Sequence, residues 1–263
     1  DYMLVLVEKL ADIVEKEFKD DRNSDALFVD WSSKNQDCEK EGVKSIACIA
    51  LKCLKKMLEI LGEDEAAKKC GIYYSRLKAQ NVDDSIEINN RIAALNVLAE
   101  RNSKKSIEKV LSTTEYEMSC FMGFYILRAL SLIGNNEKAL ELIRRYWGAM
   151  LELGATTFWE EFKPDWAENA ARIDEKVPEG KDDIHGDFGE HCYERYRLSL
   201  CHGWASGPTA FLSENIVGIK ILEPGCKKLS ICPNLAGLEW VNADFPTPYG
   251  IVRIECRCVN GKT

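Results

Sequence analysis

Apolar positions in the first two-thirds of the chain recur at the three-and-four spacing of amphipathic helices. Between residues 43 and 61 the positions that follow this spacing are Val43, Ala47, Ala50, Leu51, Leu54, Met57, Leu58 and Leu61. Gly62 comes directly after them, and a glycine in this place is typical of a helix end. The pattern predicts one long helix that ends at Gly62 and a second helix that begins after a short turn.

The same pattern of helix, turn and helix returns further along the chain. LEILGEDEAA (58–67) and LSLIGNNEKA (130–139) share an apolar helix end, a glycine, a polar turn and a glutamate that opens the next helix. ALNVLAERNSKKSIEKVL (94–111) is a weaker copy, with Asn102 near the place of the glycine. These segments predict helical hairpins in series, which form either a solenoid or a closed ring. The poor match between copies and the long irregular segment 152–200 favour the ring.

From about residue 216 the pattern changes to the alternation of short strands. Leu229 and Ile231 alternate with polar neighbours, as do Val252 and Ile254, and EPG and PTPYG mark turns between strands. The predicted fold is therefore mainly α, with a helical domain over residues 1–215 and a small β domain over 216–263.

Charge and composition exclude some classes of function. The net charge is -8, and acidic and basic residues are interspersed, which disfavours a nucleic-acid partner. No apolar run reaches the roughly 18 residues that a membrane span needs, and the first residues do not resemble a signal peptide. We therefore expect no nucleic acid and no membrane as partners.

The cysteine content suggests a reducing compartment. Eleven cysteines are irregularly spaced, and Cys48, Cys53 and Cys120 lie in apolar helical patterns, where a thiol packs as a small apolar group. A cytoplasmic location is therefore the favoured expectation. The densest group of metal-binding residue types is His185, His191, Cys192, Cys201 and His202. Their spacing matches no common zinc motif, so we expect no metal and no cofactor.

The stretch GATTFWEEF (154–162) places two carboxylates beside aromatic rings. Glu160 and Glu161 follow a threonine pair, which allows a plain role as acids at a helix start. However, Phe158, Trp159 and Phe162 surround them, and aromatic rings beside carboxylates are a common construction of sugar sites. Helix capping, core packing and sugar chemistry all stay open on these residues alone.

Two further segments combine polar and aromatic residues. SLCHGWASGP (199–208) holds His202 and Trp204 on a glycine-rich loop before an expected helix at 209–215, and its plain interpretation is a tight turn. FVDWSS (28–33) holds Asp30 and Trp31, and a helix-capping aspartate is its plain interpretation. Neither segment identifies a function alone.

Taken in order, these motifs resemble the C-terminal portion of bacterial α-L-rhamnosidases. The set is GATTFWEEF, then SLCHGWASGP, then GIKILEPGCKKLSICPNLAGLEWVNADFPTPYGIVRIE, with FVDWSS upstream. Those enzymes are inverting six-hairpin glycosidases, with an (α/α)6 barrel followed by a small β-sandwich domain. The resemblance implies a partial barrel over 1–215 and a β-sandwich-like segment over 216–263.

The resemblance also implies roles for individual residues. Glu160 corresponds to the general base that activates water, whereas Glu161 has no counterpart role. His202 corresponds to a residue expected to contact the rhamnose hydroxyls. Trp159, Trp204 and Trp31 would line the pocket, and Asp30 would be a polar wall residue. The implied partner is a rhamnose-containing glycan or glycoside.

The sequence departs from the family in one respect. The segment that carries the family's general acid lies before the position of FVDWSS, and the chain has no counterpart of it, so we expect an incomplete catalytic unit with negligible turnover. A homodimer through an exposed barrel edge is a further expectation. Two alternatives stay open: a glycosidase or lyase of this fold that acts on another sugar, and a non-catalytic carbohydrate-binding helical scaffold.

Overall fold

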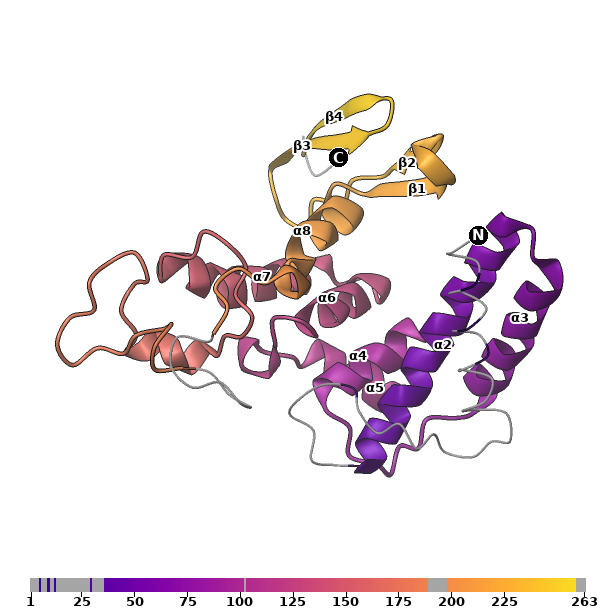
Figure 1. The fold of residues 1–263 in the computed structure, drawn as a ribbon, viewed down its shortest axis with the longest axis horizontal. Helices are drawn as coiled ribbons and strands as arrows, with labels where there is room; N and C mark the ends of the chain where they lie inside the picture. Colours follow the sequence, from indigo (N-terminus) through magenta and orange to yellow (C-terminus); the bar gives the residue numbers. More distant parts are fainter. Residues whose placement is uncertain are drawn as a thin grey trace. The chain divides into compact units, whose positions relative to one another are not determined.

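The computed structural model describes Val5, Lys9, Asp12, Val29 and residues 36–101, 103–188 and 198–258. The chain divides into two compact units, Asp1–Ser112 and Thr113–Thr263. The first unit is helical, and the second holds helices followed by two β-hairpins (Figure 1). This confirms a mainly α fold with a small C-terminal β segment. The predicted boundary near Asn215 stays a prediction.

The described residues of the first unit form two helical hairpins. Helices α2 (Gln36–Leu61) and α3 (Asp64–Ala79) pack against each other, as do α4 (Asn90–Leu98) and α5 (Lys104–Leu111). Asn89 and Ser103 begin α4 and α5, because each side chain accepts a backbone N–H of the first turn. The predicted pair of helices on either side of Gly62 is therefore confirmed.

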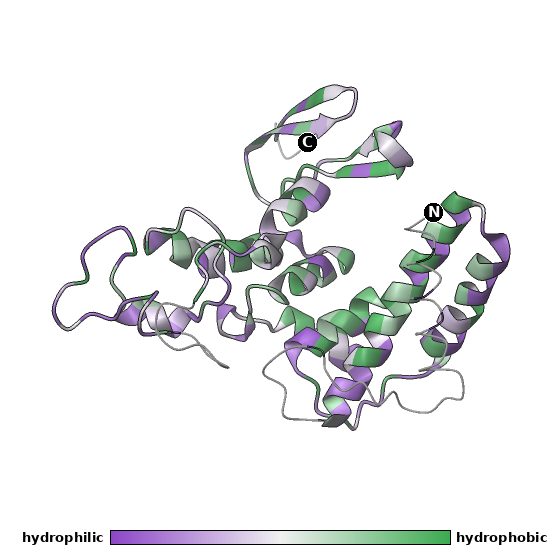
Figure 2. Cartoon of the chain, viewed as in Figure 1, coloured by the Kyte–Doolittle hydropathy of each residue, from purple (hydrophilic) through white to green (hydrophobic). Residues whose placement is uncertain are grey.

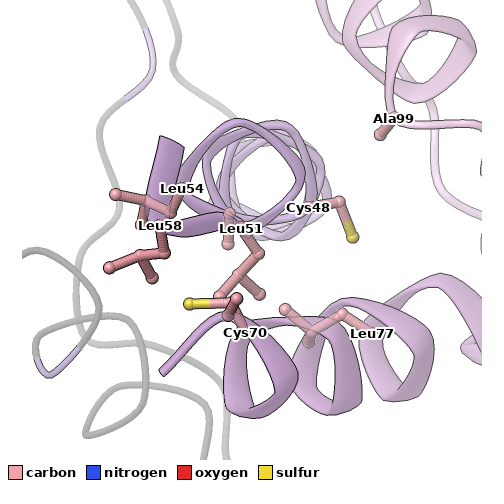
Figure 3. Packing of buried hydrophobic residues seen from close by; sticks show 9 residues of the cluster. Cys48, Leu51, Leu54, Leu58, Cys70, Leu77 and Ala99 are labelled. Carbon is pink, nitrogen blue, oxygen red and sulfur yellow. The ribbon is translucent and has the colours of Figure 1, made fainter. Parts of the chain in front are cut away.

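The core of the first hairpin comes from the predicted apolar stripe. Leu51 and Leu58 of α2 are fully buried and pack with Cys70 and Leu77 of α3 (Figure 3). Burying such a leucine stabilises the fold by about 1.5–3 kcal/mol. Met57, which shares the helical spacing, lies at the edge of this stripe and is exposed. Green and purple stripes along the helices in Figure 2 show the same separation of apolar and polar faces.

The hairpin turns share one backbone geometry. Gly62 and Gly134 both have positive φ angles, 80° and 82°, and the next residue donates its N–H to a carbonyl five residues earlier. This arrangement closes a helix C-terminus and favours glycine. In the second hairpin the left-handed residue is Glu100, with φ 59°, two positions before Asn102, near which the sequence predicts the counterpart of the glycine. Asn102 itself is outside the described residues.

The side chain of Glu100 compensates for this unfavourable backbone. Its carboxylate accepts hydrogen bonds from the ammonium groups of Lys52 and Lys78 and from the Tyr74 hydroxyl, the last at 3.2 Å. Hydrogen bonds from Lys52 and Lys78 lower the pKa of Glu100 from 4.5 to about 2. The turn is therefore tied to both helices of the preceding hairpin.

A buried polar network lies beside this turn. Arg101 and Glu41 form an ion pair with Nη2 to Oε2 at 3.0 Å, and both side chains are almost completely buried. Arg101 also donates to Ser45 Oγ at 3.0 Å, and Ser45 donates to Asn96 Oδ1 at 2.6 Å. Buried charges require such partners, so this network fixes how α2 and α4 pack.

The second unit contains the third predicted hairpin. Helices α6 (Gly123–Leu132) and α7 (Asn136–Glu152) meet at the Gly134 turn. One short helical segment, η1 (Glu115–Glu117), precedes this hairpin. Those that come after it are η2 (Pro164–Glu168), η3 (Gly203–Ala205), α8 (Gly207–Phe211) and the π-helix η4 (Leu212–Ile216). Membership of the three hairpins in a six-hairpin ring stays a prediction.

The β region consists of two antiparallel hairpins. Strand β1 (Ile219–Glu223) pairs with β2 (Lys228–Ile231) across the 3-10 turn η5 (Pro224–Cys226), and β3 (Trp240–Thr247) pairs with β4 (Gly250–Arg257). Ile219 of β1 and Ile254 of β4 share one apolar cluster, so the inner faces of the hairpins pack together. The predicted alternation is confirmed in β4, where Val252 and Ile254 face inward while Arg253 and Glu255 are exposed. It is wrong in β2, where Ile231 is exposed and Ser230 is half-buried.

Candidate active site

The segments around Glu160 and His202 lie side by side within the second unit. Glu160 N donates to Ser199 O at 2.8 Å, and His202 N donates to Phe158 O at 2.7 Å. The Thr157 hydroxyl donates to Leu200 O. The two motifs that the sequence separates by about forty residues therefore form one short backbone ladder.

This ladder corrects the helix-cap interpretation of Glu160 and Glu161. Residues 155–163 are not helical, and the next helical segment, η2, begins at Pro164. Backbone groups that would start a helix are instead bonded to the segment 199–202. Glu160 is thus held by tertiary contacts.

The carboxylate of Glu160 is largely buried. Its residue is 8% exposed, and Oε2 accepts the Ser199 N–H at 3.1 Å. The same oxygen lies 4.0 Å from Nδ1 of His202, a side chain that is one-third exposed. A buried carboxylate with a polar donor and an imidazole beside it can hold a water molecule or a sugar hydroxyl.

Trp204 connects the parts of this cluster. Its indole Nε1 donates to the backbone carbonyl of Glu160 at 3.2 Å. Its ring lies 4.7 Å from the His202 ring and 5.5 Å from the Phe121 ring, measured between centroids. The indole is 41% exposed, so it fixes the Glu160 backbone and still offers ring surface to a ligand.

Trp159 occupies a different position from the other predicted site residues. It is completely buried, and its ring packs edge-on against Phe162 with centroids 5.9 Å apart. Phe162 in turn contacts Tyr146, whose hydroxyl donates to the Phe162 carbonyl at 2.6 Å. Trp159 thus belongs to the buried aromatic core next to Glu160 in the sequence, and its predicted place in the lining of a sugar pocket stays a prediction.

A buried thiol contacts the same aromatic cluster. Cys120 Sγ is 3.5 Å from the Tyr146 hydroxyl, and burial raises the pKa of Cys120 from 9.0 to about 12. The negative charge of Glu161 raises it further. Cys120 is therefore a neutral packing group, as its apolar sequence context predicts.

Some of the predicted site residues cannot be placed relative to this cluster. Asp30 and Trp31 lie outside the described residues, and so do His191 and Cys192. Within the ranges 36–101, 103–188 and 198–258, no three side chains of metal-binding type gather in a metal-ligand arrangement. No helix among the described residues is long and apolar enough to cross a membrane.

Sequence reasoning missed two contributors to the site. Ser199 acts through its backbone N–H, which every non-proline residue carries, so the sequence holds no signal for it. Phe121 precedes α6 and meets Trp204 only in the folded unit. The aromatic residues of FWEEF indicated the region of the site, but they did not indicate Ser199 or Phe121.

Comparison with known proteins identifies the fold. The sequence matches no protein-family profile and no curated protein. Among solved structures, the chain is similar to a GH78 family rhamnosidase of Bacillus sp. GL1, with a TM-score of 0.71 and 19% identity over 97% of this chain. It is also similar to an α-L-rhamnosidase from Dictyoglumus thermophilum, with a TM-score of 0.69 and 17% identity over 97% of this chain.

These similarities show a glycoside hydrolase-like fold. The chain spans 28% and 29% of the lengths of the two rhamnosidases. The fold agrees with the resemblance read from the three motifs, and the roles of Glu160, His202 and Trp204 stay predictions.

Proposed function

We propose that this chain is the C-terminal part of an inverting α-L-rhamnosidase-like glycosidase, in which Glu160 is the water-activating base. The observation that carries the proposal is the buried Glu160 carboxylate, 4.0 Å from His202 and with the Trp204 indole on its own backbone carbonyl. Two motifs distant in sequence supply this cluster, on a fold shared with two rhamnosidases.

In this proposal Glu160 acts as an ionised carboxylate. It takes a proton from a water molecule while the water oxygen bonds to the anomeric carbon and the glycosidic bond breaks. The leaving oxygen receives its proton from an acid on the opposite face of the sugar. Inverting enzymes separate the two carboxyl groups by roughly 6.5–9.5 Å to admit the water.

The surrounding residues position the base and the sugar. The Ser199 N–H holds Oε2 of Glu160, and the Trp204 N–H holds its backbone. His202, partly exposed beside Oε2, would donate to or accept from a rhamnose hydroxyl. The exposed part of the Trp204 ring would pack against an apolar face of the sugar.

The general acid is expected from a segment without a counterpart in this chain. Loss of general-acid help typically costs about 10²–10⁴-fold in rate. A substrate whose leaving group departs without protonation should be affected much less. The isolated chain should therefore cleave 2,4-dinitrophenyl α-L-rhamnoside slowly and 4-methoxyphenyl α-L-rhamnoside negligibly.

The proposal is tested by the cleavage rates of both substrates and by the anomeric configuration of the first product. Proton NMR of the fresh dinitrophenyl reaction should show β-L-rhamnose as the first product, as inversion requires. α-L-Rhamnose as the first product would contradict the mechanism. Robust cleavage of the methoxyphenyl substrate would contradict the incomplete catalytic unit.

One observation favours a non-catalytic alternative. The Ser199 hydrogen bond to Glu160 is also what a purely structural carboxylate would make. In that case the cluster binds carbohydrate through His202 and Trp204 without cleaving it. Rhamnose binding with no cleavage of the dinitrophenyl substrate would support this alternative.

A further inference from the structure

Helix α2 carries a second apolar stripe besides the one that packs against α3. The core stripe runs through Leu51, Leu54 and Leu58. One position before these core residues, a further set of apolar side chains follows the same alternation of four and three residues: Ile46, Ala50, Cys53, Met57 and Ile60. Adjacent residues lie about 100° apart around a helix, so this second set, the outer stripe, faces away from the core stripe.

The outer stripe is largely exposed to solvent. Ile46 is 40% exposed, Met57 37% and Ile60 56%. The Cys53 thiol between them is also exposed, and Ala50 is half-buried. Residues three and four apart are neighbours on a helix surface, so these side chains form one continuous row. Single exposed apolar residues are common, whereas a contiguous row is typical of an interaction surface.

The spacing of the outer stripe indicates that its partner is another helix. Alternation of four and three residues is the spacing of the a and d positions in a coiled coil, where each side chain packs among four residues of the facing helix. The stripe keeps this spacing from Ile46 to Ile60 without a charged residue in it. A facing helix with the same spacing would therefore cover the whole row.

Two copies of the outer stripe are complementary when the helices run antiparallel. Ile46 of one copy then lies opposite Met57 of the other, and Ala50 lies opposite Cys53. Small side chains meet in the middle of the row, which lets the helices approach closely, and large side chains meet on either side of them. The antiparallel direction also places the positive end of each helix dipole beside the negative end of the other. A second copy of α2 thus fits the stripe along its length.

The charged residues of α2 do not oppose this pairing. By helical spacing Lys52 and Lys55 lie on other faces of the helix, and both are already paired with carboxylates, Lys52 with Glu100 and Lys55 with Glu59. Lys56 borders the stripe, where its alkyl stem can lie along the helix pair while the ammonium group stays in water. The outer stripe therefore meets its copy without a buried charge.

We propose that the outer stripe of α2 binds the outer stripe of a second copy of this chain as an antiparallel helix pair. The proposal gives the predicted homodimer a definite surface, and it is independent of the rhamnosidase assignment because it uses no residue of the Glu160 cluster. One helix pair buries less than the roughly 1,200–2,000 Å² of a standard interface, so the dimer is weak, with a Kd on the order of 10–100 μM.

Analytical ultracentrifugation of the full chain measures this association, over roughly a hundredfold range of concentration around that Kd. Ile46→Glu/Ile60→Glu should raise the Kd by more than about tenfold, because it places unpaired charges in the interface. Leu111→Glu/Leu132→Glu is the matched control: these leucines are 43% and 59% exposed and lie on other helices. It should change the Kd by less than about twofold.

A pair of charged variants tests the register. Ile46→Lys and Met57→Glu should each associate more than about tenfold more weakly than wild type. An equimolar mixture of the two should regain association, because in the mixed dimer the introduced lysine faces the introduced glutamate and the native Ile46 faces the native Met57. A parallel pair would not show this rescue, since it brings position 46 of one copy beside position 46 of the other.

Cross-linking of the wild-type chain needs no variant. A short bis-maleimide should join Cys53 of one copy to Cys53 of another, and mass spectrometry of the peptides should identify this link. A chain that stays monomeric throughout, as expected if another segment of the same chain covers the stripe, would overturn the proposal. So would a dimer that Ile46→Glu/Ile60→Glu leaves intact, equal weakening by the control variant, a mixture without rescue, or a cross-linked dimer that lacks the Cys53 link.

Discussion

At Glu100, the strain of a left-handed backbone opposes the stabilisation that the carboxylate gains from its ion pairs. Glu100 occupies a left-handed backbone conformation, φ 59°, which costs a residue other than glycine roughly 1–2 kcal/mol. Against this, its carboxylate is paired with Lys52 and Lys78. Replacing Glu100 by glutamine removes the charge and keeps the strain, whereas glycine removes both.

The magnitude follows from the pKa of Glu100. A pKa of about 2 against 4.5 corresponds to roughly 3.4 kcal/mol at one pH unit per 1.36 kcal/mol. The side chain is 38% exposed, however, so solvent screening reduces the contribution to about 1 kcal/mol. Glu100→Gln should thus lower the free energy of unfolding by about 1 kcal/mol at pH 7, and Glu100→Gly should be neutral within about 0.5 kcal/mol.

The pH dependence has a definite sign. A lowered pKa in the folded state means that the stabilisation is present above pH 4.5 and is lost as the pH falls toward 2. The difference between the wild-type chain and Glu100→Gln should therefore disappear near pH 2. Urea unfolding followed by circular dichroism at neutral and acid pH measures it, with Glu108→Gln, from an exposed pair with Lys104, as the control. A Glu100→Gln variant as stable as wild type at pH 7, or a Glu100→Gly variant destabilised by more than about 2 kcal/mol, would refute the balance.

Three further predictions test the packing of each unit. Gly134→Ala should lower the free energy of unfolding by only about 1 kcal/mol, the cost of the backbone strain. Gly218→Ala should lower it by more than about 3 kcal/mol, because the added Cβ would lie 1.9 Å from Cys232 O. Thermal unfolding of both variants measures the difference. Arg101→Met should destabilise by about 1–3 kcal/mol, because the buried Glu41 loses Arg101 and keeps only Lys44 as a cationic partner, and Glu41→Gln/Arg101→Met should recover part of that loss in urea unfolding. Stability should fall between pH 9 and 12 as the unfolded Cys120 thiol ionises while the folded thiol stays neutral, and a Cys120→Ala variant should lack this component of the pH-dependent unfolding curve.

Local patterns predicted the secondary structure well where one interaction dominates. The apolar stripe of residues 47–58 fixed α2, and the glycines at 62 and 134 fixed two turns through their left-handed conformation. Glu100 escaped prediction because its cost is offset by Lys52 and Lys78, which lie far from it in sequence.

The candidate site shows the same limit. The aromatic and acidic residues of FWEEF indicated the region, yet Thr156 and Thr157 suggested a helix start that the ladder with residues 199–202 prevents. Burial also divided the two tryptophans, with Trp159 inside and Trp204 partly exposed. The burial of each tryptophan depends on segments that are distant in sequence, so its sequence neighbours do not predict it.

The rate and the sugar affinity of Glu160→Gln, measured together with Glu161→Gln as the matched control, test the central claim most directly. Our account predicts that Glu160→Gln lowers cleavage of 2,4-dinitrophenyl α-L-rhamnoside by about 10²-fold or more while binding L-rhamnose within about threefold of wild type, as loss of a base requires. Glu161→Gln should retain both rate and affinity. Wild-type cleavage by Glu160→Gln, or parallel loss of affinity and rate, would contradict a catalytic base at position 160.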